Sequence, residues 1–366
     1  MEMKFTEENA FFVASNSSNG FYSHYSACFD DKNIKRVYAI KGGPGTGKNR
    51  FLREVSVCGV LCGYSCEYIY CSSDPESLDG VILEKSGERI ALLDATFPHV
   101  YDPKNPGVRE ELIDLCAFWN RKKLAEYGEE ISRINRQKNE AYERVYRYLA
   151  GAGKMDANRR ALIKPYIRTD AIRSFAAKLL RDVDSDGVLD VRPALIRSLG
   201  MRGDVCLDTY FRQAKQLFVI EDCRGSAQYL TEALLSLAIE KKLRLRFSHD
   251  PVLTECCDGI FLETSGIVFA VIDSRLCRYP HKLIRMRRFV DIASMQAIRG
   301  EINFSERMYR SMLAGAAECL TAIKALHFRL EEIYGTAMDF EKKEIFTKIF
   351  CQRLFDLQND ASCDTI

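Results

Sequence analysis

Short apolar runs alternate with longer amphipathic stretches along the chain, and the two patterns predict strands and helices. Residues 36–40 (RVYAI) and 90–93 (IALL) have the composition of buried strands, and residues 48–61 are predicted to form a helix. Charges of both signs are interspersed through residues 119–150, which predicts long helices with a solvent-facing side. Alternating strands and helices predict an α/β fold with mainly parallel sheets, although residues 81–93 also fit a hairpin.

The chain also resembles itself. Glycines, a Leu-Glu pair, a Ser-Gly pair and a terminal aspartate coincide when residues 80–96 are laid over residues 259–275 without a gap. Three pairs of segments carry this similarity in the same order: 37–49 with 217–229, 80–96 with 259–275, and 146–152 with 309–316. We therefore expect an internally duplicated chain in which each α/β layer is followed by a helical segment.

The duplication predicts four structural segments. The α/β layers are expected where the strand patterns lie, and helical patterns fill the rest of each half. The expected boundaries are 1–107 for the first α/β domain, 108–200 for its helical segment, 201–284 for a second α/β domain and 285–366 for the C-terminal helical segment.

A glycine-rich turn lies between the first predicted strand and its helix. The sequence GGPGTGKN fits the phosphate-binding pattern G-x-x-x-x-G-K-[ST] up to its last position. Glycines allow the backbone to curl so that successive N–H groups face phosphate oxygens, and the lysine reaches the terminal phosphates of a nucleotide. The expected nucleotide-binding residues are Gly42, Gly43, Pro44, Gly45, Thr46, Gly47, Lys48 and Asn49.

Catalysis needs further groups around this loop. Asp94 ends a buried strand, where a carboxylate can hold the water shell of Mg²⁺, and Asn49 stands where a hydroxyl ligand is usual. We therefore expect Asn49 and Asp94 at the metal and Lys48 and Asp94 in catalysis. His99 and Asp102 have no counterpart in the second half, so they are candidates for polarising water or sensing the γ-phosphate, with packing of a proline-rich loop as the alternative.

The second half has lost the features that bind phosphate. Glu221 and Asp222 replace the first residues of the turn, and Gln228 replaces the lysine, so we expect Coulomb repulsion and a pseudo-site that does not bind. Asp74 and Asp79 follow the second strand, yet similar aspartates persist in the second half. A structural role, such as a helix cap, is therefore favoured for both.

Composition limits the other classes of function. The formal charge is +2, and no apolar run is long enough to cross a bilayer, so we expect a cytoplasmic protein without a membrane partner. Nucleic acid is an improbable partner because the basic run at 283–289 has no aromatic platform. The chain contains 14 cysteines but no C-x-x-C pair, which favours reduced, packed thiols over a zinc site of the usual spacing.

Four segments together resemble a known group of proteins. In order along the chain they are NGFYSHYSACF, IKGGPGTGKN, YCSSDPESLDG and LLDATFPHVYDPKNPG. They are similar to an uncharacterised bacterial family of tandem P-loop ATP-binding proteins within the P-loop NTPase superfamily, and the likeness covers the whole chain. The resemblance implies two related P-loop NTPase-like layers that bind ATP with Mg²⁺, and it implies no particular substrate.

Members of that family carry Ser or Thr after the lysine and often have an intact second loop, so this chain departs from them at Asn49 and across 221–228. We expect a weak ATPase or a nucleotide-dependent switch whose helical segments report to a protein partner. One alternative is a small-molecule or nucleotide kinase with Asp74 or Asp102 as its base. The other is a non-catalytic scaffold in which ATP is structural.

Overall fold

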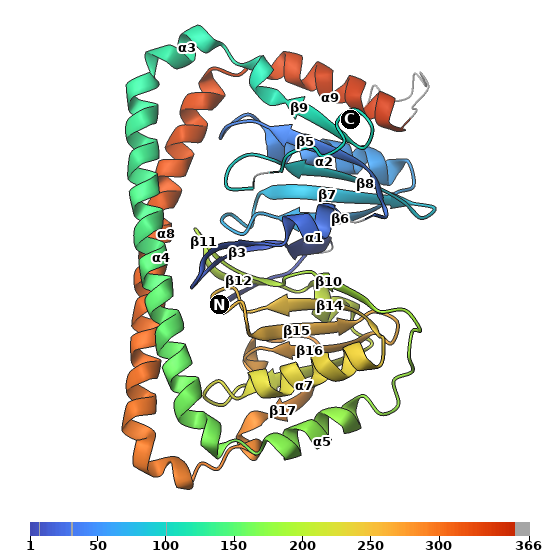
Figure 1. Cartoon of the computed structure of the whole chain (residues 1–366). Coiled ribbons are helices and arrows are strands. Elements are labelled where there is room, and N and C mark those ends of the chain that lie inside the picture. The colour runs from blue at the N-terminus through green and yellow to red at the C-terminus, as the bar shows by residue number, and fades with distance from the viewer. Residues whose placement is uncertain (7, 31, 100, 356–366) are drawn as a thin grey trace.

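Two six-stranded sheets and a pair of long helices form the frame of the chain (Figure 1). The computed structural model describes residues 1–6, 8–30, 32–99 and 101–355. The sheets lie one above the other, and the helices run along one side of both (Figure 1). The chain is thus of mixed α/β class, as the sequence predicts.

The first sheet is mainly parallel, as expected, and one antiparallel strand makes it mixed. Its strands, in spatial order, are β2 (Asn9–Phe12), β6 (Ser65–Tyr70), β7 (Leu78–Lys85), β8 (Glu88–Asp94), β5 (Ile34–Lys41) and β9 (Glu110–Asp114). Strand β7 runs antiparallel to β6 and β8, whereas the other pairs are parallel. The hairpin alternative is therefore correct for β7 and β8, which turn at Ser86 and Gly87 with φ angles of 54° and 82°.

The second sheet has a corresponding order of strands. These are β10 (Asp190–Pro193), β14 (Arg244–His249), β15 (Cys257–Leu262), β16 (Ile267–Val271), β13 (Gln216–Glu221) and β17 (Lys282–Arg285). The pattern of parallel and antiparallel pairs also matches that of the first sheet. In each sheet the strand before the glycine-containing loop lies second from the edge.

Smaller elements join the two sheets. A three-stranded sheet contains β1 (Glu2–Lys4), β12 (Gly203–Leu207) and β11 (Arg197–Gly200), and β3 (Ala14–Ser17) pairs with β4 (Gly20–Ser23). The backbones of Phe12 and Leu195 exchange hydrogen bonds of 2.7 and 2.9 Å. Short helices follow these hairpins at α1 (Tyr25–Phe29) and α6 (Thr209–Gln213).

Two expected boundaries are wrong in detail. Strand β9 extends the first sheet beyond residue 107, and β10 adds to the second sheet before residue 201. Both are edge strands of only a few residues, so their apolar pattern is too short to separate from that of the neighbouring helices. Residues 356–366 of the expected C-terminal segment lie outside the described part of the chain.

Each main sheet carries helices, and the long pair connects them. Helix α2 (Lys48–Leu61) packs on the first sheet and α7 (Ala227–Glu240) on the second. The long helices α4 (Gly128–Ile163) and α8 (Arg299–Thr336) run antiparallel side by side (Figure 1). The remaining helices are α3 (Arg121–Glu126), α5 (Thr169–Leu179) and α9 (Phe340–Phe355), with 3₁₀ turns at Leu115–Phe118, Lys164–Tyr166, Ser274–Leu276, Met286–Phe289 and Ser294–Ile298.

The helical segments do not stay with the layer that precedes them in the sequence. Helix α5 packs against α7 of the second layer, and α9 packs against α2 of the first. At about 1.5 Å per residue, α4 is roughly 54 Å long and carries the chain from one sheet to the other. The helices that follow one layer in the sequence therefore pack against the other layer in space.

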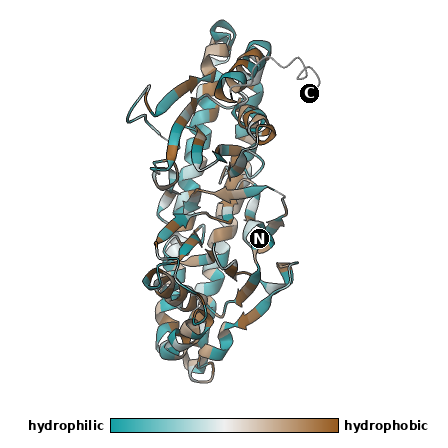
Figure 2. Ribbon diagram, turned by 90° about the vertical axis from the view of Figure 1, so that its right-hand side faces the viewer, coloured by the Kyte–Doolittle hydropathy of each residue, from teal (hydrophilic) through white to brown (hydrophobic). Residues whose placement is uncertain are grey.

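Glycines allow the long helices to approach closely. A Cβ at Gly315 would lie 2.8 Å from the ring of Tyr148, and one at Gly151 would lie 2.6 Å from the sulfur of Met312. Figure 2 shows hydrophilic and hydrophobic residues mixed along these helices. Within the described residues, no helix combines the length and the apolar character needed to cross a membrane.

Candidate functional site

The first glycine loop, residues 42–47, connects the carboxyl end of β5 to the N-terminus of α2. Gly45 and Gly47 have φ angles of 70° and 78°, a region that favours glycine, and Gly47 is the residue before the helix. Thr46 is fully buried, and its hydroxyl donates to the carbonyl of Gly43 at 2.9 Å. The strand, the positive φ angles and the helix start are the arrangement in which backbone N–H groups bind anions.

Lys48 places its ammonium at this loop. Its Nζ donates to the carbonyls of Gly42 at 2.6 Å and Gly43 at 2.9 Å, and it lies 3.6 Å from Oδ2 of Asp94. The side chains of Lys48 and Asp94 are only 15% and 12% exposed, so water screens this pair weakly. The loop thus holds a positive charge beside its N–H groups and next to a carboxylate.

Asp94 is fixed by its own neighbours. Its Oδ1 accepts from the backbone N–H of Thr96 at 2.8 Å, and the Thr96 hydroxyl donates to Gly42 at 2.9 Å. Burial raises the pKa of Asp94, Lys48 opposes this rise, and Asp79 adds to it. The structure therefore brings Asp94, Lys48 and the loop together, as the sequence predicts.

Asn49 has a different role from the one expected of a metal ligand. Its side-chain oxygen accepts from the backbone N–H of Leu78 at 3.1 Å, at the start of β7. A ligand to Mg²⁺ must sit within about 2.1 Å of the ion in octahedral geometry, which this engaged oxygen does not favour. Of the two expected metal residues, Asp94 fits an ion beside bound phosphate and Asn49 does not.

His99 joins the site and Asp102 does not. The Nε2 of His99 lies 3.1 Å from Oδ2 of Asp79, and its ring stacks on Tyr25 with centroids 4.7 Å apart. Burial alone would lower the pKa of His99, but the Asp79 carboxylate outweighs it, so the pKa is raised. Asp102 is exposed, and within the described residues it makes no hydrogen bond or ion pair with this group.

The two aspartates expected to be structural differ from each other. Asp74 accepts from Arg202 Nε at 2.8 Å and from the backbone of Glu76 at 3.4 Å, so it connects its own turn to the turn between β11 and β12. Asp79 is instead buried beside His99. Asp74 therefore has a structural role, as expected, although it lies in a turn and not at a helix N-terminus, and the structural role expected of Asp79 stays a prediction.

Residues from distant parts of the chain cover the loop. A Cβ at Gly43 would lie 3.1 Å from the Trp119 ring, and one at Gly45 would overlap the backbone carbonyl of Glu331 in α8. Burial and the nearby Lys48 ammonium also lower the pKa of Lys138 of α4. Sequence reasoning missed these contacts, because charged positions on a long amphipathic helix look alike.

The second loop, residues 222–227, has the same place in the second sheet and different chemistry. Both carboxylate oxygens of Asp222 accept backbone N–H groups, from Gly225 at 2.7 Å and from Ala227 at 2.8 Å. Gln228 accepts from Arg160 of α4 at 2.9 Å. The chain's own carboxylate therefore occupies the N–H groups that a phosphate would need.

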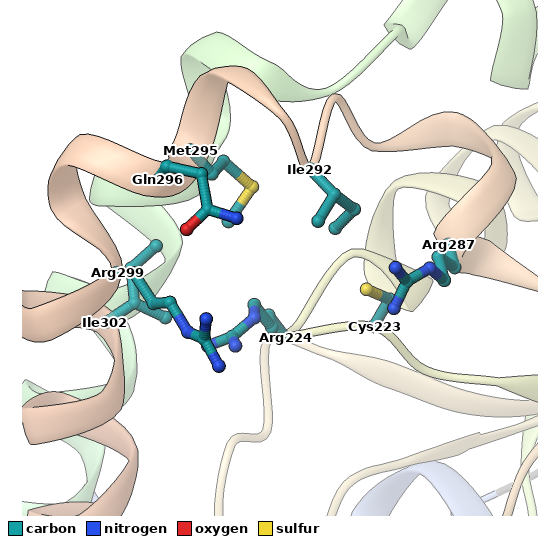
Figure 3. A pocket seen from close by; sticks show the side chains of 8 residues that line it. All are labelled: Cys223, Arg224, Arg287, Ile292, Met295, Gln296, Arg299 and Ile302. Atoms are coloured by element: carbon teal, nitrogen blue, oxygen red, sulfur yellow. The ribbon is translucent and has the colours of Figure 1, made fainter.

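Positive charge is also present near the second loop. A cavity of about 220 Å³ is lined by Cys223, Arg224, Arg287 and Arg299 together with Ile292, Met295, Gln296 and Ile302 (Figure 3). Arginines therefore lie near the second loop, although Gln228 stands at the position of the lysine, as expected. The second loop also differs from the first because the carboxylate of Asp222 accepts its backbone N–H groups.

Comparisons of the chain with models of protein families, with curated proteins and with solved structures gave no match.

Proposed function

We propose that the chain is a P-loop protein that binds ATP or another nucleoside triphosphate at residues 42–49. The observation that carries this proposal is the position of Lys48, whose ammonium lies between the loop carbonyls and Asp94. Positive φ angles at Gly45 and Gly47 orient the loop backbone for phosphate oxygens. On this proposal the two matching sheets are copies of one ancestral unit.

The proposal includes one nucleotide site per chain. In the second loop, Asp222 takes the N–H groups and Gln228 stands in place of the lysine. A phosphate would have to displace a carboxylate that makes two charge-assisted hydrogen bonds, each worth about 1.5 to 3 kcal/mol. The second half is then a scaffold whose loop is closed by its own side chain.

Slow turnover and a switch function follow from the surroundings of the first loop. Mg²⁺ would be held through Asp94, while the side chain of Asn49 stays hydrogen-bonded to the backbone of β7. Ala95 has no group that could act as a general base for the attacking water. Helix α8 lies against Gly45, and the ammonium of Lys48 lies near enough to Lys138 of α4 to lower the pKa of Lys138. A change in the loop on nucleotide binding is therefore passed to the long helices, the surface proposed for a protein partner.

The alternatives have less support. A kinase would need Asp74 or Asp102 as a base over the loop, but Asp74 is bound to Arg202 and Asp102 is exposed. A scaffold in which ATP is only structural differs from a switch in two respects. The scaffold predicts no turnover at all, and it predicts no change in the long helices when nucleotide is removed.

Paired variants test the proposal. Lys48→Ala removes the ammonium and leaves Asp94 facing the phosphates, so affinity for a non-hydrolysable ATP analogue should fall roughly 30- to 1000-fold, or about 2 to 4 kcal/mol. Gln228→Ala is the matched control at the same position of the second loop and should leave affinity unchanged. Equal losses in both variants would contradict a site built on the first loop alone.

A further inference from the structure

Three side chains with metal-binding atoms meet behind the first loop. Cys71 directly follows β6, Asp79 lies in β7 and His99 lies in the segment after β8. Their thiol, carboxylate and imidazole ligand atoms all lie within 4.8 Å of one another. The three residues are far apart in sequence and have no motif spacing, so sequence reasoning about zinc sites did not find them.

The hydrogen bonding of this group is incomplete. Asp79 and His99 are 4% and 7% exposed, and His99 Nδ1 makes no hydrogen bond within the described residues. The 3.1 Å contact between His99 Nε2 and Asp79 Oδ2 has the distance of an ion pair. Buried polar atoms without a hydrogen bond are unusual in native proteins, and a bound ion is one physical explanation.

The distances suit a small tetrahedral ion. Zinc bonds of about 2.0 to 2.3 Å to nitrogen, oxygen and sulfur place neighbouring ligand atoms roughly 3.3 to 3.7 Å apart. The 3.1 Å separation of His99 Nε2 and Asp79 Oδ2 is close to this value, and the Cys71 sulfur lies within 4.8 Å of ligand atoms of both side chains. A mixed sulfur, nitrogen and oxygen set favours zinc over magnesium, which prefers oxygen ligands alone.

The surroundings of the cysteine and the histidine are ordered. Burial and the Asp79 carboxylate raise the pKa of the Cys71 thiol well above its usual range, and the backbone N–H groups of Asp74 and Ser73 oppose this rise. The Tyr25 ring stacks on His99 and holds the orientation of the imidazole. These contacts fix the donor atoms of two of the three side chains before any ion binds.

The second half offers an internal comparison. Asp258 lies in β15, at the place that Asp79 has in β7, and its carboxylate is 3.2 Å from the Arg197 guanidinium. A fixed cation therefore compensates the buried aspartate of the second sheet. Within the described residues no guanidinium lies against Asp79, and its neighbour is instead the imidazole of His99, a side chain that can bind a metal ion.

We propose that Cys71, Asp79 and His99 bind one zinc ion, with a fourth position left for water. The ligands do not include Lys48 or any residue of the loop, so the site does not depend on the proposed nucleotide binding. Cobalt(II) is the probe of choice, because it takes the same tetrahedral sites and its thiolate bond gives a charge-transfer absorption band.

The test is a titration of chelator-treated protein with Co²⁺ in the absence of nucleotide. We expect one equivalent to bind, with the thiolate band and the intense visible bands of tetrahedral cobalt, and Zn²⁺ should abolish both. Cys71→Ser should remove the thiolate band and weaken metal affinity more than about a hundredfold. Cys206→Ser, a buried cysteine near Asp258, is the matched control and should keep the band.

Two results would overturn the proposal. One is folded wild-type protein that binds no cobalt, which would mean that Asp79 and His99 form only a buried ion pair. The other is a thiolate band that persists in Cys71→Ser. Because the wild-type titration decides the first point, a poorly folding variant does not remove the test. Loss of ATP binding in a separate assay would leave both results interpretable.

Discussion

Replacement of Gly45 by alanine tests whether helix α8 seals the first loop. The new Cβ would overlap the carbonyl oxygen of Glu331 and lie 3.1 Å from its Cα, and neither backbone atom can rotate away. The positive φ of 70° adds a conformational cost of about 1 to 2 kcal/mol for a residue with a side chain. Overpacking against a fixed backbone adds about 1 to 3 kcal/mol. We expect Gly45→Ala to lower the free energy of unfolding by about 2 to 5 kcal/mol.

Two other glycines separate these contributions. Gly87 has a φ of 82° and no atom within 4 Å of an added Cβ, so Gly87→Ala should cost only the conformational part, about 1 to 2 kcal/mol. Gly225 has a φ of 93°, and its Cβ would meet the flexible end of Arg159 at 3.1 Å. Gly225→Ala should therefore lie between the other two variants, because a side chain can move aside.

Urea-induced unfolding, followed by circular dichroism, measures all three variants against wild type. The unfolding midpoints compare directly where the slope with urea is unchanged. The expected order of destabilisation is Gly87→Ala, then Gly225→Ala, then Gly45→Ala. Losses for Gly45→Ala and Gly87→Ala that agree within about 0.5 kcal/mol would refute the contact between the loop and α8.

Two further predictions concern metal and pH. Asn49→Thr should make nucleotide binding more dependent on Mg²⁺ and raise the rate of phosphate release. The reason is that a hydroxyl replaces an amide whose oxygen is hydrogen-bonded to the backbone of Leu78. Unchanged turnover and Mg²⁺ dependence would contradict this prediction. Burial and, to a smaller extent, the nearby His249 lower the pKa of His24 to about 4. Because the folded protein disfavours a protonated His24, the stability that the neutral imidazole contributes is complete above pH 6.5 and is lost as the pH falls toward 4. The loss is at most about 3 kcal/mol. His24→Asn should flatten the fall in unfolding free energy over this range, and an identical pH profile would contradict it.

The sequence was sufficient for the parts that depend on local pattern. Glycine spacing predicted the loop between β5 and α2, and Asp94 was found because it ends an apolar strand. The exchange of α5 and α9 between the layers was not predictable, since helical periodicity shows which face is buried and does not show against which sheet. For the same reason, the positions of Lys138 and Glu331 near the first loop could not be predicted from the sequence.

Two polar residues show why the type of a residue and its place in the sequence do not determine its role. Asp222 suggested repulsion of phosphate, yet its carboxylate is itself the anion bound by the second loop. Asn49 suggested a weak metal ligand, yet its oxygen accepts a hydrogen bond at the start of β7. Each role depends on where a side chain points, which the spacing of residues does not determine.

Calorimetric titration with a non-hydrolysable ATP analogue measures the number of nucleotide sites per chain directly. The closed second loop and the open first loop predict a stoichiometry near one. Binding of two nucleotides would contradict the role given to Asp222. Absence of binding at millimolar analogue, a concentration that detects even about 4 kcal/mol of binding free energy, would contradict the proposed nucleotide site itself.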